Sequence, residues 1–370
     1  MSELLPFKIE RYFARYEFTA EYLLCSSDCE SMAIRDLLAL EPRAADSFQN
    51  HWLGYTETQG ASALRREICR IYTTIQPDQV MVHTGAEEGI FCFMQAALRA
   101  GDHLIVQSPC YQALSEVARS LGCEITFWRA AEANGWAFDP EDLRRAIRPN
   151  TRAVVINNPH NPTGHLMTRD ELRTVDQIVQ ERDLILFSDE VYRECEYSMA
   201  DRLPAGCDLN EKAVSLGVLS KTYGLPGLRI GWVATRNAEL LARMTSVKDY
   251  TTICNSAPSE FLAELALRHR ERIAQRNLDL VVNNLIILDA FFDRYSERFA
   301  WVRPKAGPIA FPRLVEDEVD SFCDRLVKQA GVLLLPGTVY DDPENHFRIG
   351  FGRKNLPEAV ARLESFLQSS

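Results

Sequence analysis

Residues 218–232, VLSKTYGLPGLRIGW, place one lysine and one arginine inside an otherwise mostly apolar stretch. Apolar residues crowd both Lys221 and Arg229, so both cations are expected to lie close to the core. A buried cation is strongly destabilising unless it is paired or loses its charge. Two neighbouring buried cations also repel each other, which adds to the destabilisation unless an anion lies between them. The stretch therefore predicts an anion-binding turn with a paired or neutral lysine.

Short apolar strands alternate with helices on the N-terminal side of this turn. The expected strands are 80–83, 103–107, 124–128, 153–158, 184–189, 213–217 and 230–234, and the expected helices are 61–73, 86–98, 112–121, 140–147 and 169–181. Strands without a polar face are typical of a parallel sheet covered by helices on both sides. Right-handed crossovers bring the carboxyl ends of such strands to one edge, where α/β sheets bind their ligands. The fold class predicted is α/β, with a mainly parallel sheet flanked by helices and a smaller α+β domain.

The length of 370 residues exceeds the usual size of a single hydrophobic core. We expect an N-terminal segment, 1–50, that packs on the small domain and the active site. A large α/β domain is expected over 51–285 and a small C-terminal α+β domain over 286–370. Residues 236–295 are expected to form long helices.

Composition narrows the class of protein. A formal net charge of −11 argues against nucleic acid or an anionic membrane as a partner. We find neither a long apolar run nor a signal peptide in the sequence, so a cytoplasmic protein is expected. The ten cysteines are expected to be reduced thiols.

Cys25 and Cys29 lack a second Cys/His pair, so no metal is expected. His160 and His165 flank a Pro/Gly turn, which favours solvated loop histidines.

Polar residues fall where the expected strands end. Asp189 closes one strand, Asn161 lies just past another, and a helix opens at Gly85 with free N–H groups that attract phosphate. Together with the two cations of 218–232, they suggest a phosphate, a protonated ring nitrogen facing Asp189, and a lysine able to form a Schiff base. This is the pyridoxal phosphate arrangement. Taken singly, Asp189 could instead cap a turn, Tyr111 could be core and Arg348 could pair at the surface.

The chain resembles the class I and II aminotransferases of pyridoxal-phosphate fold type I. Seven segments carry the resemblance in the family's order, namely GYTETQGASALRREI (54–68), TGAEEGIF (84–91), SPCYQAL (108–114), NNPHNPTG (157–164), SDEVY (188–192), SKTYGLPGLRIGW (220–232) and FRIGF (347–351). The resemblance implies pyridoxal 5'-phosphate as cofactor, an α-amino acid as substrate, and reaction through aldimine and quinonoid intermediates. It also implies a homodimer with shared active sites, and cis peptide bonds at Ser108–Pro109 and Asn161–Pro162.

The resemblance also implies roles for single residues. Lys221 would form the Schiff base and carry protons, Asp189 would keep the ring nitrogen protonated, and Tyr192 would hydrogen-bond the phenolic oxygen. Arg348 would clamp the substrate carboxylate, because a planar guanidinium fits a planar anion. The other cofactor-binding residues implied are Gly85, Ala86, Glu87, Tyr111, Asn161, Ser220 and Arg229, and Tyr55 from the neighbouring subunit; Asn161 is also placed at the substrate.

Two acids of the N-terminal segment, Glu17 and Asp28, lie near several aromatic residues. In the family this segment folds over the substrate, so these acids are candidates to bind a cationic side chain. The alternative is a solvated amphipathic helix. Two departures from the family pattern bear on the site: Val218 stands where Ser or Thr often contacts phosphate, and CSSDCES (25–31) stands where many relatives have a glycine.

Three functions compete. The leading one is an amino-acid transaminase. The second is a pyridoxal-phosphate cyclase or lyase, because LSKTYGLPGLRIGW, KDYTTICNS, IAFPRL and GVLLLPGTVY resemble the subgroup that contains capreomycidine synthase. That chemistry eliminates a hydroxyl from a hydroxylated arginine and closes a cyclic guanidine, and it uses the same Lys221 and Asp189. The third is a cofactor-binding regulator, which is disfavoured because no helix-turn-helix segment is attached.

Overall fold

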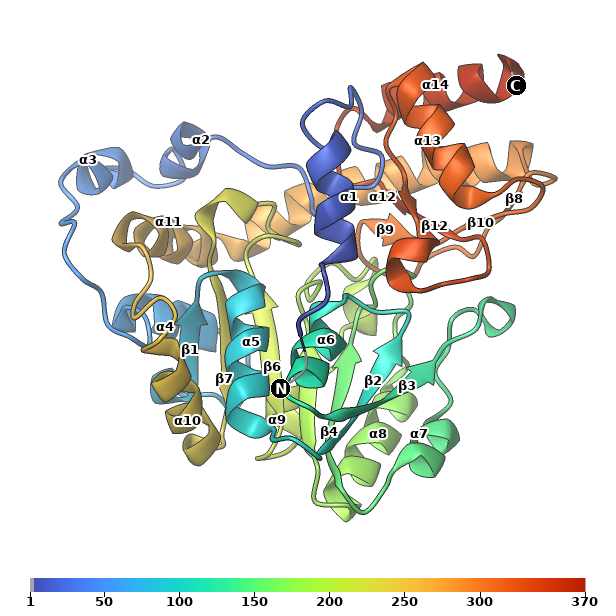
Figure 1. The fold of residues 1–370 in the computed structure, drawn as a ribbon. Helices are drawn as coiled ribbons and strands as arrows, with labels where there is room; N and C mark the ends of the chain where they lie inside the picture. The colour runs from blue at the N-terminus through green and yellow to red at the C-terminus, as the bar shows by residue number, and fades with distance from the viewer. Residues whose placement is uncertain (1–2, 370) are drawn as a thin grey trace.

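A seven-stranded sheet forms the centre of the computed structural model, which describes residues 3–369 (Figure 1). The strand order is β1-β7-β6-β5-β4-β2-β3, and every neighbouring pair is parallel except the two that involve β7. The strands are β1 (Val80–His83), β2 (His103–Ser108), β3 (Glu124–Arg129), β4 (Thr151–Asn157), β5 (Ile185–Asp189), β6 (Val214–Val218) and β7 (Gly231–Thr235). The prediction of a mainly parallel sheet is confirmed.

Helices cover both faces of this sheet because its inner strands are buried on both faces. Along β4, Val155 packs into the core cluster beneath α5 and α6, whereas its neighbour Val154 packs into the cluster beneath α7 and α8. This alternation follows from the two-residue period of a strand. The helices around the sheet are α4 (Ser62–Cys69), α5 (Gly85–Ala97), α6 (Ala113–Ser120), α7 (Pro140–Ala146), α8 (Arg169–Glu181), α9 (Gly206–Leu209), α10 (Ala238–Lys248) and α11 (Ala257–Arg268).

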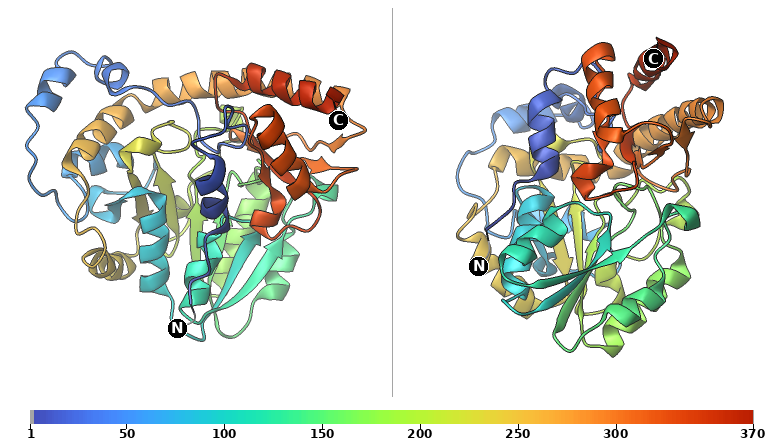
Figure 2. Two further views of the ribbon diagram at one scale, coloured as in Figure 1. Left: turned by 45° about the horizontal axis from the view of Figure 1, so that its top comes forward. Right: turned by 45° about the vertical axis from the view of Figure 1, so that its right-hand side comes forward.

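The C-terminal third forms a second core beside the sheet (Figures 1 and 2). The long helix α12 leads from the region of the sheet into this part. The elements are α12 (Arg270–Arg294), β8 (Phe299–Ala300), β9 (Ile309–Ala310), β10 (Arg313–Leu314), α13 (Val319–Ala330), β11 (Leu335–Pro336), β12 (Phe347–Gly350) and α14 (Leu356–Ser369). Buried aromatic residues of α12, α13 and β12 pack together, among them Phe292, Phe322 and Phe347.

The N-terminal segment joins the two parts. Its helices are α1 (Lys8–Tyr16), α2 (Ile34–Leu38) and α3 (Ala44–Gln49). The backbone N–H of Lys8 donates to Gln112 beside α6, and the hydroxyl of Tyr12 donates to the carbonyl of Leu334 at 3.0 Å. Helix α1 therefore lies across the junction, over the edge of the sheet where the strands β4, β5 and β6 end (Figures 1 and 2).

Two details test the sequence predictions. The cis peptide bonds at Ser108–Pro109 and Asn161–Pro162 are confirmed, and Asn158–Pro159 is a third. The assignment of His160 and His165 as solvated was wrong, because both are buried, with 1% and 5% of their surface exposed. Their loop folds back under the ring of Phe138, which contacts both imidazoles edge-on.

The cysteines are all free thiols, as expected. Among residues 3–369, no helix is both long enough and apolar enough to cross a membrane.

Candidate active site

A cavity of about 640 Å³ opens where β4, β5 and β6 end. Most of the residues singled out from the sequence line it, and α1 supplies part of the opposite wall. The lining includes Ala86, Glu87, Tyr111, Asn161, Asp189, Tyr192, Ser220, Lys221, Arg229 and Arg348, together with Glu17 and Asp28. The topology of a parallel sheet explains this convergence, because its strand ends meet at one edge.

Asp189 ends β5 deep in this cavity, with 5% of its surface exposed. Its Oδ1 accepts a hydrogen bond from the N–H of Val191 at 3.2 Å, and its backbone carbonyl accepts one from Asn157 Nδ2 at 3.0 Å. Burial raises the pKa of Asp189 from 3.8 to about 7. A carboxylate at this place is therefore stabilised by a ligand that brings a positive charge or an N–H donor to it.

Lys221 follows β6 and points its amine into the same cavity. Its Nζ donates to Ser27 Oγ at 3.0 Å, while its backbone carbonyl accepts from the N–H of Cys29 at 3.2 Å. Burial lowers the pKa of Lys221, and the nearby cations Arg348 and Arg229 lower it further against the opposing effect of Asp28 and Asp189. A larger neutral fraction makes this amine a better nucleophile.

Three groups beside Lys221 form a place for an anion. Helix α5 begins at Gly85, and among the described residues no side chain caps its N-terminus, so its first backbone N–H groups are available to bind an anion. Gly85 has φ +80°, a conformation that favours glycine, and the guanidinium of Arg229 lies close to it, since a Cβ there would be 2.5 Å from Arg229 Nη2. Ser220 Oγ is buried and has no hydrogen-bond partner within residues 3–369. An anion with several oxygens satisfies all of these donors.

Arg348 lies on β12 with 2% of its surface exposed. Its Nε and Nη2 donate to the carbonyl of Cys25 at 3.1 and 2.9 Å, and its Nη1 donates to Tyr340 Oη at 2.6 Å. Asn161 Oδ1 lies 3.4 Å from the same Nη1. The hydroxyl of Tyr192 donates to the carbonyl of Ser27 at 3.0 Å. The guanidinium is thus fixed in place and turned toward the cavity.

The two acids of the N-terminal segment differ in their surroundings. Both oxygens of Asp28 accept from Arg353 Nη2 at 2.9 Å, so Asp28 is already paired. Glu17 caps the C-terminal end of α1 and lines the cavity, and among residues 3–369 it forms no ion pair. Burial raises the pKa of Glu17, and the neighbouring Glu10 and Asp28 raise it further. Of these two acids, Glu17 is therefore the one without an ion-pair partner among the described residues, and Glu10 and Glu87 line the same cavity.

Tyr55 is the one predicted residue that lies far from the cavity within this chain. Its side chain is 87% exposed in the loop before α4. Conversely, the sequence did not point to Ser27, Asn157, Tyr340 and Arg353. Asn157 could have been predicted from the sequence, because it ends a strand beside Asp189. The other three reach the site through contacts between segments that are distant in sequence.

Comparisons with known proteins agree with this geometry. Residues 21–363 match the model of the family described as aminotransferase class I and II. Capreomycidine synthase of Streptomyces vinaceus is 28% identical over 97% of this chain and 93% of its own length. A PLP-dependent aminotransferase from Streptococcus suis superimposes with a TM-score of 0.93 at 32% identity, over 99% of this chain and 98% of that one. The PLP-dependent cyclase OrfR superimposes with a TM-score of 0.91 at 27% identity, over 100% and 98%.

Proposed function

The chain belongs to the class I and II aminotransferases, pyridoxal-phosphate enzymes of fold type I, and we propose that it transfers the amino group of an α-amino acid with Lys221 as the reactive amine. The observation that carries this proposal is the position of Lys221. Its amine, with a lowered pKa, shares one cavity with a buried carboxylate on one side and an anion-binding helix start on the other.

The residues present fit pyridoxal phosphate. In the described part of the chain, Ser220 Oγ lacks a hydrogen-bond partner and the start of α5 lacks a side-chain cap, which suits a phosphate. Gly85, Ala86, Glu87, Ser220 and Arg229 would surround that phosphate, Asp189 would face the ring nitrogen, Asn161 and Tyr192 the phenolic oxygen, and Tyr111 the ring face. When bound, the cofactor supplies an electron sink for charge that develops at the substrate Cα.

The protein's own groups do the remaining work. Arg348 would bind the α-carboxylate, and because Cys25 and Tyr340 hold the guanidinium, little side-chain entropy is lost on binding. Lys221 Nζ would take the proton from the substrate Cα and return it, with Ser27 Oγ 3.0 Å away to orient the amine. Asp189 would hold a proton on the ring nitrogen. Helix α1 and residues 26–28 would limit water access.

One experiment separates transamination from its rival. The purified holoenzyme would be incubated with single amino acids and with hydroxyarginines, with and without a 2-oxo acid, and products followed by mass spectrometry. A 2-oxo acid formed from the amino donor supports transamination. Loss of water from a hydroxyarginine, without transfer of nitrogen, identifies the second candidate, a cyclase or lyase. The position of Glu17 and the resemblance to capreomycidine synthase and OrfR favour testing that candidate.

A preference for a substrate with a cationic side chain is inferred from Glu17, which lines the cavity. Glu17 has no ion-pair partner among the residues that the structure describes, so a guanidinium or ammonium side chain would gain a charge-assisted hydrogen bond of about 1.5–3 kcal/mol. Arginine-like amino acids should therefore bind about 10- to 100-fold more tightly than aspartate or glutamate, as measured by absorbance changes of the cofactor. Glu17→Gln should weaken the preference strongly. Asp28→Asn should weaken it less directly, by releasing Arg353 from its carboxylate partner.

The control for this preference is Asp36→Asn, which removes an exposed acid of α2 outside the cavity. It should leave the ratio of affinities unchanged. Equal responses to aspartate and arginine, unaltered in Glu17→Gln, would show that this wall does not select the substrate.

We further propose a homodimer whose active sites are shared, with Tyr55 reaching the phosphate of the neighbouring subunit. The exposed apolar side chains around Tyr55 support this proposal. The side chains of Trp52, Leu53 and Tyr250 are 77%, 76% and 93% exposed. The segment that contains Trp52 and Leu53 contacts the segment that contains Tyr250, because the hydroxyl of Thr56 donates to the carbonyl of Asn255 at 3.1 Å. A second copy would cover these residues.

Tyr55→Phe tests the shared site. Losing a hydrogen bond to a charged phosphate should weaken cofactor binding about 10-fold. Tyr250→Phe serves as the matched control, since it removes the hydroxyl of another tyrosine of the proposed interface that is not placed at the phosphate. Sedimentation equilibrium should show a dimer for wild type and both variants. A fully active monomer would contradict the proposal.

The domain division at about residues 50 and 285 and a cytoplasmic location complete the proposal. The separate core of the C-terminal third supports the division, although α12 runs through residue 285 without a break. The ten free cysteines support a reducing compartment.

A further inference from the structure

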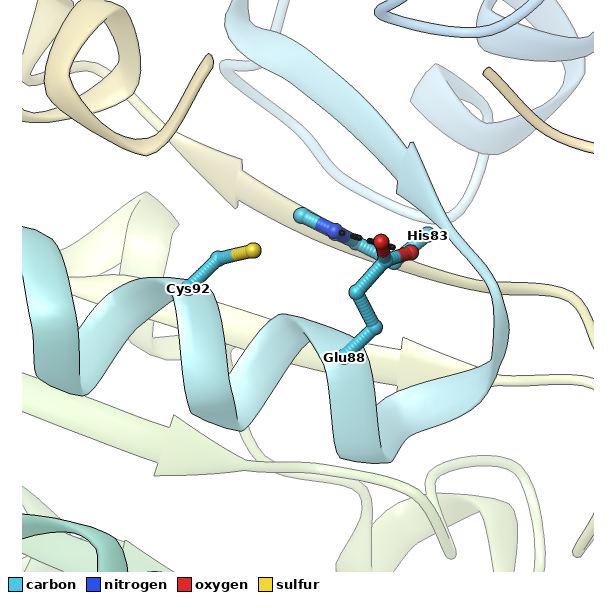
Figure 3. Close-up of side chains that lie close together, drawn as sticks. All are labelled: His83, Glu88 and Cys92. Carbon is cyan, nitrogen blue, oxygen red and sulfur yellow. Dashed lines mark ion pairs between the residues drawn. The ribbon is translucent and has the colours of Figure 1, made fainter. Parts of the chain in front are cut away.

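Three side chains that the proposed reaction does not use converge behind the anion site. His83 ends β1, and Glu88 and Cys92 lie one turn apart on the same face of α5. Each offers one ligand atom, and these atoms all lie within 4.8 Å of one another. Figure 3 shows the imidazole, the carboxylate and the thiol directed into one space between the strand and the helix. Imidazole, carboxylate and thiolate are the side chains that bind Zn²⁺.

The imidazole of His83 is the second observation. It is completely buried, yet within residues 3–369 neither Nδ1 nor Nε2 has a hydrogen-bond partner, and Nδ1 lies 3.7 Å from Glu88 Oε2, an ion-pair distance if the ring is protonated. A buried polar group without a partner is rare, because it forfeits its hydrogen bonds to water. A metal ion bound between the ring and the carboxylate would provide what the ring lacks.

We propose that His83, Glu88 and Cys92 form a Zn²⁺ site. On binding, a zinc–sulfur bond replaces the S–H bond of Cys92, and the proton leaves to solvent with no change of oxidation state. Three protein ligands leave a fourth position for a water molecule.

The charges of the two anionic ligands match the charge of the ion. The carboxylate and the thiolate together carry two negative charges, which equal the charge of the ion. A buried ammonium, Lys248, lies nearby, but it is held by the carbonyl of Val82 at 2.6 Å and by Asn255 Oδ1 at 3.0 Å. The hydroxyls of Thr251 and Thr252 donate to Glu88 Oε1, which leaves Oε2 on the side of His83. These hydroxyls would orient the carboxylate as outer ligands commonly do.

Such a site would close the turn between β1 and α5. His83 and Glu88 flank Thr84 and Gly85, and Glu88 Oε2 already accepts from the N–H of Thr84. An ion held by both residues would therefore tie the strand end to the helix start that supplies the anion site. The role inferred is structural, and it does not depend on which amino acid the enzyme uses.

The test measures metal rather than activity. Holoenzyme produced in zinc-supplemented medium should contain one Zn²⁺ per chain by elemental analysis. After chelation and addition of Co²⁺, the visible d–d bands of a four-coordinate ion with a thiolate ligand should appear. Cys92→Ala, Glu88→Gln and His83→Gln should each abolish stoichiometric binding. Thr252→Val should weaken Co²⁺ binding about 10-fold.

Cys123→Ala is the matched control, because it removes another buried thiol of the same core cluster. It should bind metal as wild type does. Circular dichroism would confirm that each variant is folded, and wild type should show a zinc-dependent rise in melting temperature that Cys92→Ala lacks. Wild-type protein without zinc, or zinc retained by folded Cys92→Ala, would overturn the proposal.

Discussion

Replacing Lys221 with alanine should abolish covalent attachment of the cofactor and lower kcat/KM by a factor of about 10⁴ or more. Both effects have one cause: the variant lacks the amine that binds the cofactor aldehyde and carries protons at the substrate Cα. Borohydride reduction of the wild type should label one lysine, and peptide mass spectrometry should identify it as Lys221. In Lys221→Ala the label should be absent.

Lys212→Ala provides the control for this loss. Lys212 is an exposed lysine that pairs with Asp183 on the surface. Its removal should leave both the label and the turnover as in wild type. A label on another lysine in the wild type, or turnover retained by Lys221→Ala, would refute the assignment of the reactive amine. The overall fold should survive, because Lys221 Nζ bonds only to Ser27 Oγ among the described residues.

Asp189→Asn should lower kcat/KM by about 100- to 1,000-fold. A neutral amide cannot hold the proton on the ring nitrogen, and breaking a buried ion pair costs about 3–5 kcal/mol. Cofactor absorbance should shift as the ring nitrogen loses its proton. Asp208→Asn, which changes an acid outside the cavity, should show neither effect. Wild-type kinetics in Asp189→Asn would exclude a role for this carboxylate.

The stability of the apoprotein gives an independent measure of the same group. Burial raises the pKa of Asp189 from 3.8 to about 7, so its folded form favours the proton more than its unfolded form does. Its contribution to stability is therefore full below about pH 4 and is lost as the pH rises through about 7, by at most about 4 kcal/mol. Urea unfolding of the apoprotein should show a larger loss between these pH values for wild type than for Asp189→Asn. Adding cofactor should narrow the difference.

Sequence periodicity and motif spacing were enough to predict the sheet and the chemistry at its edge. Strand and helix periods are local, so β1 and α8 were predicted at the residues where they occur. The carboxyl ends of parallel strands lie at the same edge of a sheet, whatever the lengths of the connecting loops. Asp189 and Lys221 lie at or just past the ends of neighbouring strands, so strand order and direction are enough to bring them together.

The residues that surround these groups are set by tertiary contacts. Ser27 reaches Lys221 across 194 positions of sequence, and Arg353 reaches Asp28 across 325. The same holds for His160 and His165, which were expected in solvent and are covered by Phe138. Burial and pairing depend on which distant segments pack against a residue. The local sequence pattern does not predict those contacts, because the packing interactions that stabilise them form only when the whole chain is folded.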